Sequence, residues 1–199
     1  MSITMKNVTF AYGQTLICEE LNWTLPESGV VCLWGASGCG KTTLLRILTG
    51  LEKPQNGTVE RPHKAAMVFQ EDRLLPWLTV RQNAALACDD AARVDALLEA
   101  VGLAGYADST PDEISGGQQR RVALVRALAA DRDLLLLDEP FTGLDEETKA
   151  LVLPLIREAA RTHPVVLVTH IAAEAETLGA AMITLNGLPL TGDLIPTEN

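Results

Sequence analysis

The first fifty residues combine a stretch of alternating polar and apolar positions with one apolar run and one helical pattern. Alternation from Ile3 to Leu25, broken at Tyr12-Gly13-Gln14, predicts an antiparallel β-hairpin or meander. Val30 to Trp34 is a short apolar run that leads into glycines, and Lys41 to Thr49 carries leucine and isoleucine at helical spacing. An antiparallel layer is therefore expected first, followed by a strand, a loop and a helix.

The middle of the chain is dominated by helical patterns. Ala65 to Phe69 predicts another buried strand, after which Thr79 to Ala87 and Ala91 to Val101 have helical spacing, with Gly102 as a helix stop. We expect a helical subdomain over about residues 71–130, inserted into a core made by residues 1–70 and 131–199. At 199 residues the chain is long enough for one domain with a small inserted subdomain, and the sequence contains no internal repeat.

The last third of the chain contains two continuous apolar runs. Leu134 to Leu137 and Val165 to Val168 are typical of strands covered on both faces of a parallel sheet. Glu146 to Arg161 has a helical pattern that Pro154 should bend, and Ala181 to Leu190 predicts two short strands around an Asn-Gly pair. The expected fold class is α/β, with a mostly parallel sheet, an N-terminal antiparallel β layer and an inserted α-helical subdomain.

Composition and charge narrow the classes of function. Of the 199 residues, 47% are hydrophobic and 21% charged, which suits one well-buried globular domain. The formal net charge of -10 argues against a nucleic-acid partner, because binding to phosphates requires a basic face. The sequence has no apolar run long enough to cross a membrane, and its first residues lack a hydrophobic signal core. We therefore expect a cytoplasmic chain that is not exported.

The cysteines and two of the histidines do not form a metal-binding pattern. No cysteines have C-x-x-C or Cys/His spacing, so neither a zinc site nor a disulfide framework is expected. His63 and His163 stand alone beside prolines, where solvated loop positions explain them better than metal ligation. Reduced thiols are expected at Cys18, Cys32, Cys39 and Cys88.

A glycine-rich segment lies between the first predicted buried strand and the helix that follows it. Gly35-Ala36-Ser37-Gly38-Cys39-Gly40-Lys41-Thr42 matches G-x-x-x-x-G-K-[ST], a loop whose backbone N–H groups curl around phosphates at a helix N-terminus. Lys41 is expected to neutralise the β- and γ-phosphates, Thr42 to ligate Mg²⁺, and Thr43 to support the phosphate contacts. An ordinary glycine-rich turn is the alternative, but the strand-loop-helix context favours a site for ATP and Mg²⁺.

Cys39 lies inside this segment. Thiols near a helix N-terminus are often reactive, so oxidation or alkylation of Cys39 could block nucleotide binding. The alternative is a small residue tolerated in a tight loop, which is the simpler interpretation.

Two adjacent acids follow the first of the two apolar runs. A buried strand has no structural need to end in two charges, yet Asp138 and Glu139 come directly after Leu137. In enzymes with this phosphate loop, an aspartate at this place holds Mg²⁺, which assigns that role to Asp138. Glu139 is then placed to orient and deprotonate a water molecule. Hydrolysis is favoured over transfer to a small substrate, and a simple turn before Pro140 is the remaining alternative.

A second glycine pair begins another helical pattern. Ile114-Ser115-Gly116-Gly117-Gln118-Gln119-Arg120-Arg121 resembles the LSGGQ signature of the ABC (ATP-binding cassette) ATPases, and it follows the phosphate loop in the expected order. Ser115 and the glycine amides can offer hydrogen-bond donors to a γ-phosphate at a helix start. An ordinary helix cap and turn is the alternative.

The resemblance to the ABC ATPases covers nearly the whole chain and implies its fold and assembly. It implies a P-loop NTPase with a RecA-like core that binds and hydrolyses ATP. It also implies a head-to-tail dimer, in which each ATP lies between the P-loop (residues 35–42) of one copy and the signature (residues 114–118) of the other.

Four further positions resemble motifs of this family. Tyr12 resembles the aromatic residue that stacks on adenine, with a plain sheet aromatic as the alternative. Gln70 resembles the Q-loop glutamine, which contacts the metal and the attacking water and links the core to the helical subdomain. Asp145 resembles the D-loop aspartate that communicates across the dimer, and His170 resembles the switch histidine that contacts the γ-phosphate.

The chain also departs from the family pattern in three places. Ile114 replaces the usual leucine, and Thr142-Gly143 stands where Ser-Ala is common, which could loosen the D-loop. Ile171 follows His170 where an aspartate is frequent, so support for the histidine must come from elsewhere. None of these changes removes a catalytic group.

The resemblance also implies partners and a location. The residues around the signature and the paired acids look more like importer ATPases than fused exporters, and Leu74 to Val80 resembles the nitrate, sulfonate and taurine importer group. An integral membrane permease, a second copy of the chain and a solute-binding protein are implied, with the chain peripheral on the inner face of the cell membrane. The apolar residues of Leu74 to Val80 are expected either to receive a permease helix or to form subdomain core.

Three other functions stay open from the sequence. They are a small exporter ATPase, a soluble cassette protein acting in DNA repair or translation, and a nucleotide-dependent binding module without turnover. The intact Glu139 and His170 argue against the last of these.

Overall fold

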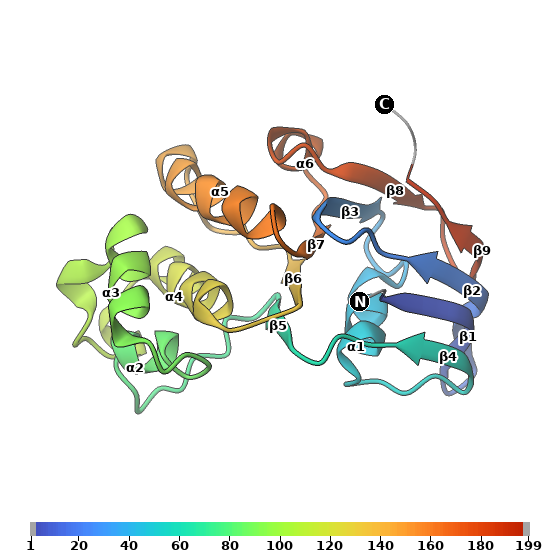
Figure 1. Ribbon diagram of the computed structural model, residues 1–199, viewed down its shortest axis with the longest axis horizontal. Helices are drawn as coiled ribbons and strands as arrows, with labels where there is room; N and C mark the ends of the chain where they lie inside the picture. The colour runs from blue at the N-terminus through green and yellow to red at the C-terminus, as the bar shows by residue number, and fades with distance from the viewer. Residues whose placement is uncertain (1–2, 197–199) are drawn as a thin grey trace.

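The computed structural model describes residues 3–196, which form two β-sheets and a group of helices lying side by side (Figure 1). The antiparallel sheet has the order β4-β1-β2-β9, and β1 pairs antiparallel with both β2 and β4. Its strands are β1 (Thr4–Tyr12), β2 (Thr15–Thr24), β4 (Asn56–Glu60) and β9 (Leu190–Leu194). The predicted N-terminal antiparallel layer is therefore confirmed.

The second sheet has the order β5-β6-β7-β3-β8, and its neighbouring strands all pair in parallel. Its strands are β3 (Gly29–Gly35), β5 (Ala65–Val68), β6 (Leu134–Asp138), β7 (Pro164–Val168) and β8 (Ala181–Leu185). Alternate residues of β6 pack into two different hydrophobic clusters, one on each face of the sheet. Leu134 and Leu136 belong to one cluster, and Leu135 and Leu137 belong to the other. A strand packed on both faces explains the continuous apolar run and confirms the predicted α/β class.

Two core clusters cover the faces of the parallel sheet. One cluster joins it to β1 and β2 through α1 (Lys41–Thr49), which buries Leu44, Leu45, Ile47 and Leu48. The other cluster packs the opposite face against α4 (Gly116–Ala129) and α5 (Glu146–Ala160), which continues through Pro154.

The helices α2 (Val80–Ala84), α3 (Ala91–Ala100) and α4 pack on one another to one side of the parallel sheet (Figure 1). Two short 3₁₀ turns, Ala104–Tyr106 and Pro111–Glu113, lie between α3 and α4. These helices, here called the helical subdomain, fall within residues 71–130, although the limits of that subdomain remain a prediction. Among residues 3–196, no helix combines the length and apolar character that a membrane crossing requires.

Several local expectations are corrected by the structure. The helix expected over Thr79 to Ala87 is only five residues long, and α6 (Ala172–Thr177) was not predicted. Strand β4 was missed because its residues are mostly exposed and show no apolar alternation. Strands β8 and β9 do flank the Asn-Gly pair, but β8 joins β3 and β9 joins β2, so the chain crosses between sheets there.

Candidate functional site

A cavity of about 450 Å³, here called the sheet-edge cavity, opens at the carboxyl ends of β3, β6 and β7. Ligand sites of open parallel sheets form at this edge, because the loops that follow the strands meet there. The lining residues are Tyr12, Ile17, Gly35, Ser37, Gly38, Gly40, Lys41, Thr42, Thr43, Gln70, Asp138, Glu139, Thr142, Val168 and His170. The fold thus gathers the phosphate loop, the paired acids, the glutamine and the histidine into one wall.

The glycine-rich loop turns from β3 into α1. Gly38 and Gly40 have φ angles of 81° and 93°, a backbone conformation that would be strained in a residue with a β-carbon. Helix α1 begins at Lys41, directly after this loop. The buried Lys41 side chain folds over the loop, where Nζ donates hydrogen bonds to the carbonyl oxygens of Gly35 (2.7 Å) and Ala36 (2.8 Å). A positive charge is therefore held against the loop at the N-terminus of a helix, an arrangement that favours anions.

Two loop residues, Ala36 and Cys39, are not part of the cavity wall. Cys39 is only 4% exposed and packs in the core cluster that joins the two sheets. Its Sγ lies 3.7 Å from Nζ of Lys41. A thiol reagent must open the loop to reach this sulfur, which favours the packing interpretation of Cys39, while its redox sensitivity stays a hypothesis.

A threonine and an aspartate meet at the sheet edge. The Thr42 hydroxyl donates a 2.7 Å hydrogen bond to Oδ2 of Asp138, which is 2% exposed. Burial raises the pKa of the Asp138 carboxyl group, whereas the hydrogen bond from Thr42 lowers it. Neighbouring hydroxyl and carboxylate oxygens are donors that Mg²⁺ accepts, and a cation would favour the charged carboxylate. The pair therefore fits the predicted metal position.

A glutamate and a histidine form the second contact in the cavity. Oε2 of Glu139 lies 2.9 Å from Nδ1 of His170, and the side chains are 18% and 68% exposed. Glu139 has a φ of 51°, and its N–H donates to the carbonyl oxygen of Val168 (2.9 Å). A non-glycine residue in this conformation costs about 1–3 kcal/mol and is typical of functional sites.

The loop that carries His170 is supported by a threonine and a glutamate. The Thr169 hydroxyl donates to Glu174 (2.5 Å) and accepts a hydrogen bond from the N–H of Ile171 (3.1 Å). Glu174 in turn forms an ion pair with Lys149 of α5 (3.3 Å). These contacts hold the backbone on either side of His170, while the His170 side chain itself contacts Glu139.

Tyr12 and Gln70 also line the sheet-edge cavity. The Tyr12 ring is 41% exposed and meets Phe10 edge-on at 4.8 Å, while its hydroxyl donates to Glu52 (2.8 Å). Gln70 is exposed and follows β5 closely. Both side chains therefore line the cavity, and their predicted roles remain predictions.

The signature residues cap α4 outside the cavity wall. Ser115 Oγ accepts from the N–H of Gln118 (3.3 Å), and Gln118 Oε1 accepts from the N–H of Ser115 (2.8 Å). Ser115 and Gly116 are exposed, and Gly117 lies so near the D-loop that a β-carbon would come within 3.1 Å of the Gly143 carbonyl oxygen. Ser115 and Gly116 therefore lie at the surface and are not part of the cavity wall of their own chain.

Asp145 is an exposed helix cap that is also absent from the cavity wall. Its Oδ1 accepts a hydrogen bond from the N–H of Thr148 (2.8 Å), and the Thr148 contact lowers the pKa of this carboxyl group. Capping of α5 accounts for the contacts of Asp145, and its role between subunits remains a prediction.

Arg120 is a candidate residue that sequence reasoning did not single out. It is 3% exposed, and it lies on α4 with its guanidinium group against the ends of β5 and β6. Its acceptors are the carbonyl oxygens of Phe69 (2.6 Å), Gln70 (3.4 Å), Asp138 (2.9 Å), Glu139 and Pro140 (3.0 Å) and the carboxylate of Asp72 (2.9 Å). Arg120 lies four residues before the buried Leu124 and therefore on the same face of α4. An arginine on the apolar face of a helix is unusual, and this pattern could have indicated Arg120 from the sequence.

Comparisons with known proteins agree with this geometry. The sequence profile of the family described as ABC transporter matches residues 18–142. Aliphatic sulfonates import ATP-binding protein SsuB 3 of Paraburkholderia xenovorans (strain LB400) is 44% identical over 191 residues, covering 93% of this chain and 77% of that protein. SsuB 2 of Frankia alni is 43% identical over 189 residues, covering 92% and 77%.

A solved structure matches as well. A dimeric ATP-binding cassette in a post-hydrolysis state, bound to ADP and Pi, has a TM-score of 0.85 and 28% identity, covering 100% of this chain and 98% of that chain. Because sequence and fold both match over nearly the full chain, the protein belongs to the ABC transporter family.

Proposed function

We propose that the protein is the ATP-hydrolysing subunit of an ABC importer, coupling ATP binding, dimer closure and hydrolysis to solute uptake through a separate membrane permease. The observation that carries the proposal is the Glu139–His170 contact of 2.9 Å beside the Thr42–Asp138 contact of 2.7 Å in one cavity. One pair offers a base for water and the other offers cation ligands, which together are parts of a nucleotide hydrolase.

ATP binding is assigned to the loop between β3 and α1. The N–H groups of the P-loop and the ammonium group of Lys41 bind the phosphates, and the exposed face of Tyr12 is offered to adenine. Thr42, Asp138 and Gln70 would hold Mg²⁺, which when bound supplies positive charge beside the terminal phosphates.

Hydrolysis is assigned to Glu139 and His170, which contact each other in the cavity wall. Glu139 orients the attacking water and takes its proton, and His170 contacts the γ-phosphate while its Nδ1 stays near Glu139. The backbone of Glu139 is fixed on both sides, by Val168 at its N–H and by Arg120 at its carbonyl oxygen. Its carboxylate is therefore held in place before the nucleotide arrives, which lowers the cost of reaching the transition state.

The proposal is tested first at nucleotide binding. Lys41→Ala is expected to weaken ATP binding about 10- to 150-fold, since a hydrogen bond to a charged group contributes about 1.5–3 kcal/mol. Equilibrium dialysis with labelled ATP measures this change. Lys64→Ala is the matched control, because Lys64 pairs with Asp131 on the surface. Unchanged ATP affinity of Lys41→Ala would remove phosphate binding from this loop.

A head-to-tail dimer is proposed from the position of the signature. Ser115 and Gly116 are exposed and lie outside the cavity that holds the P-loop of the same chain. The N-terminus of α4 in a second copy could therefore donate hydrogen bonds to the γ-phosphate of an ATP bound in this cavity. The similar solved cassette is dimeric, which supports this arrangement.

The permease contact is proposed at the loop between β5 and α2. The fully buried Asn83 orders this loop: its Oδ1 accepts from the N–H of Leu75 (2.8 Å), and its Nδ2 donates to the carbonyl oxygens of Leu75 (3.1 Å) and Leu78 (3.0 Å). Trp77 within the loop is 73% exposed. An exposed tryptophan on an ordered loop favours the docking alternative for Leu74 to Val80 over the core alternative.

Trp77→Ala is expected to reduce affinity for the permease by about 30-fold or more, because truncating an aromatic anchor costs about 2 kcal/mol or more. ATP binding to the isolated chain should not change, since Trp77 is not in the cavity wall. Binding to permease reconstituted in lipid nanodiscs measures the effect. Tyr106→Ala is the control, an aromatic residue of the same subdomain that is 43% exposed. Equal losses for both variants would count against a specific contact at Trp77.

The solute proposed for uptake is an aliphatic sulfonate or a similar small anion. This choice rests on the two relatives, which are named as import proteins for aliphatic sulfonates, and it favours import over the exporter alternative. A solute-binding protein is the proposed third partner, and the inner face of the cell membrane is the proposed location. Genes beside this one that encode a permease and a binding protein would support the assignment.

A further inference from the structure

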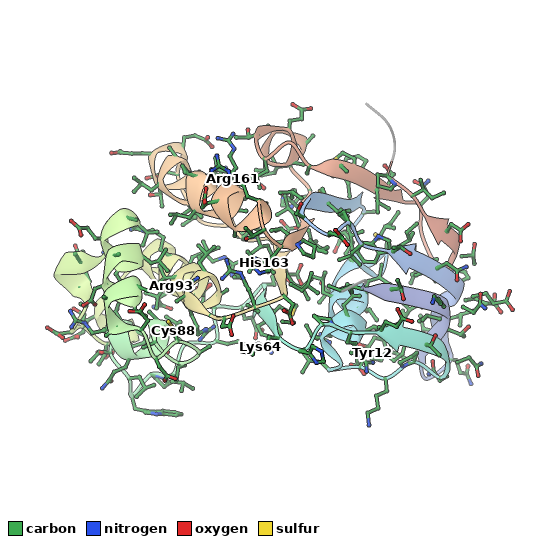
Figure 2. All side chains as sticks on the ribbon, in the orientation of Figure 1. Tyr12, Lys64, Cys88, Arg93, Arg161 and His163 are labelled. Carbon is green, nitrogen blue, oxygen red and sulfur yellow. The ribbon has the colours of Figure 1, made fainter. Side chains whose placement is uncertain are left out.

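A second cavity, of about 520 Å³, lies between the helical subdomain and the core and is here called the subdomain cavity. Its wall comes from α3, the end of α4, α5 and the turn before β7, and it shares no residue with the sheet-edge cavity. Figure 2 shows Arg93 on the helical side and His163 on the core side of this junction. The volume and the largely apolar wall, which includes Leu97, Leu128 and Leu155, are typical of small-molecule sites.

Arg132 places a buried positive charge in this wall. The residue is 8% exposed, and its Nη1 donates to the carbonyl oxygens of Leu128 (2.6 Å) and Ala130 (2.9 Å) at the end of α4. Among residues 3–196, its Nε is buried without an acceptor and its Nη2 has none either. Burial and the nearby Arg93 lower the pKa of this guanidinium group. An anion at Nη2 would offset the cost of burying this charge, whereas Nε is too enclosed to reach a ligand.

Arg93 adds a second guanidinium group at the rim. Its Nη2 donates to the Leu128 carbonyl oxygen (3.1 Å), and within the described part of the chain no carboxylate forms an ion pair with it. The two acids of the same wall already have partners, because Asp131 pairs with Lys64 and Glu158 pairs with Arg161 (2.9 Å). Within residues 3–196 neither arginine forms an ion pair, and the nearby Asp131 acts on both only through its charge.

We propose that the subdomain cavity binds a small amphiphilic anion, with a sulfonate, carboxylate or phosphate head group at Arg93 and Arg132 and an apolar tail along Leu97 and Leu155. Guanidinium groups suit such head groups because they donate charge-assisted hydrogen bonds. Arg132 would donate through Nη2, since its Nη1 already bonds carbonyl oxygens and its Nε is enclosed. A ligand here would contact both α3 and α5.

The test uses 1-hexanesulfonate as the probe and isothermal titration calorimetry on the full chain, with and without saturating MgATP. Saturable binding of one probe per chain is expected, and it should persist with MgATP because the two cavities are separate. Inorganic sulfate and hexan-1-ol, which supply only the head or only the tail, should each bind at least tenfold more weakly. Competition with phosphatidylglycerol vesicles separates the sources: displacement assigns the site to a lipid head group, and no displacement assigns it to a free solute.

Three variants test the residues named. Arg93→Gln and Arg132→Gln should each weaken binding at least tenfold, and Ala96→Trp should abolish it by filling the cavity. Arg132 also caps α4, so if Arg132→Gln fails to fold, the exposed positions 93 and 96 carry the test. Arg157→Gln is the control, since this α5 arginine donates to the Thr177 carbonyl oxygen and should bind the probe unchanged. The proposal is overturned if no saturable binding occurs, if MgATP displaces the probe, or if Arg93→Gln and Ala96→Trp bind it like the wild type.

Discussion

Glu139→Gln is expected to lower kcat for ATP hydrolysis about 10²- to 10⁴-fold while ATP still binds. The amide keeps the shape of the side chain and can still contact His170, but it cannot take a proton from water, which is the contribution of a general base. Lys41 and the P-loop are untouched, so ATP affinity should stay within about threefold of the wild type. Phosphate release and ATP binding, measured on the same preparation, separate the two effects.

The matched control for this variant is Glu99→Gln. Glu99 is an exposed residue of α3 in the helical subdomain, and the same loss of one charge there should leave kcat unchanged. Turnover of Glu139→Gln at more than one-tenth of the wild-type rate would show that another group acts as the base.

Arg120→Met is expected to reduce the free energy of unfolding by about 3–5 kcal/mol. The change removes hydrogen bonds to carbonyl oxygens at the ends of β5 and β6, and it leaves the Asp72 carboxylate without its cation. ATP hydrolysis should fall too, since the Glu139 carbonyl oxygen is one of the acceptors. Urea unfolding followed by circular dichroism measures the stability change.

Arg161→Met provides the surface comparison for Arg120. Its side chain is 75% exposed and, among residues 3–196, forms an ion pair only with the exposed Glu158, so a loss of no more than about 1 kcal/mol is expected. Arg120→Lys should fall between the two, because an ammonium group cannot reach all the acceptors of a guanidinium group. A stability of Arg120→Met within about 1 kcal/mol of the wild type would contradict the role given to this arginine.

Much of the fold could be predicted because its strands are strongly patterned. Strands β6 and β7 are buried on both faces, which explains why the apolar runs Leu134 to Leu137 and Val165 to Val168 predict parallel strands. Strand β4 gave no such signal, since it is an exposed edge held by pairing with β1. The sequence around β8 and β9 also does not reveal that these strands belong to different sheets. Their pairing partners, β3 for β8 and β2 for β9, lie far away in the sequence.

The candidate site could be predicted as far as its motifs are local. The P-loop, Asp138 and Glu139 are recognised from adjacent residues, and their assembly into one wall follows from the carboxyl ends of parallel strands. The support of His170 could not be predicted, because Lys149 and Glu174 become neighbours only when α5 packs beside the loop after β7. Arg120 was missed because five of its acceptors are backbone carbonyl oxygens, which carry no residue-type signal.

The nucleotide-dependent oligomeric state tests most directly whether two copies share each ATP. Sedimentation of Glu139→Gln with MgATP should show a dimer, because ATP stays bound between the copies. Adding Ser115→Arg to this variant should give a monomer that still binds MgATP, since Ser115 is exposed and lies outside the cavity of its own chain. If the double variant loses ATP binding, or forms the dimer as readily as before, the signature does not act on the nucleotide of a second copy.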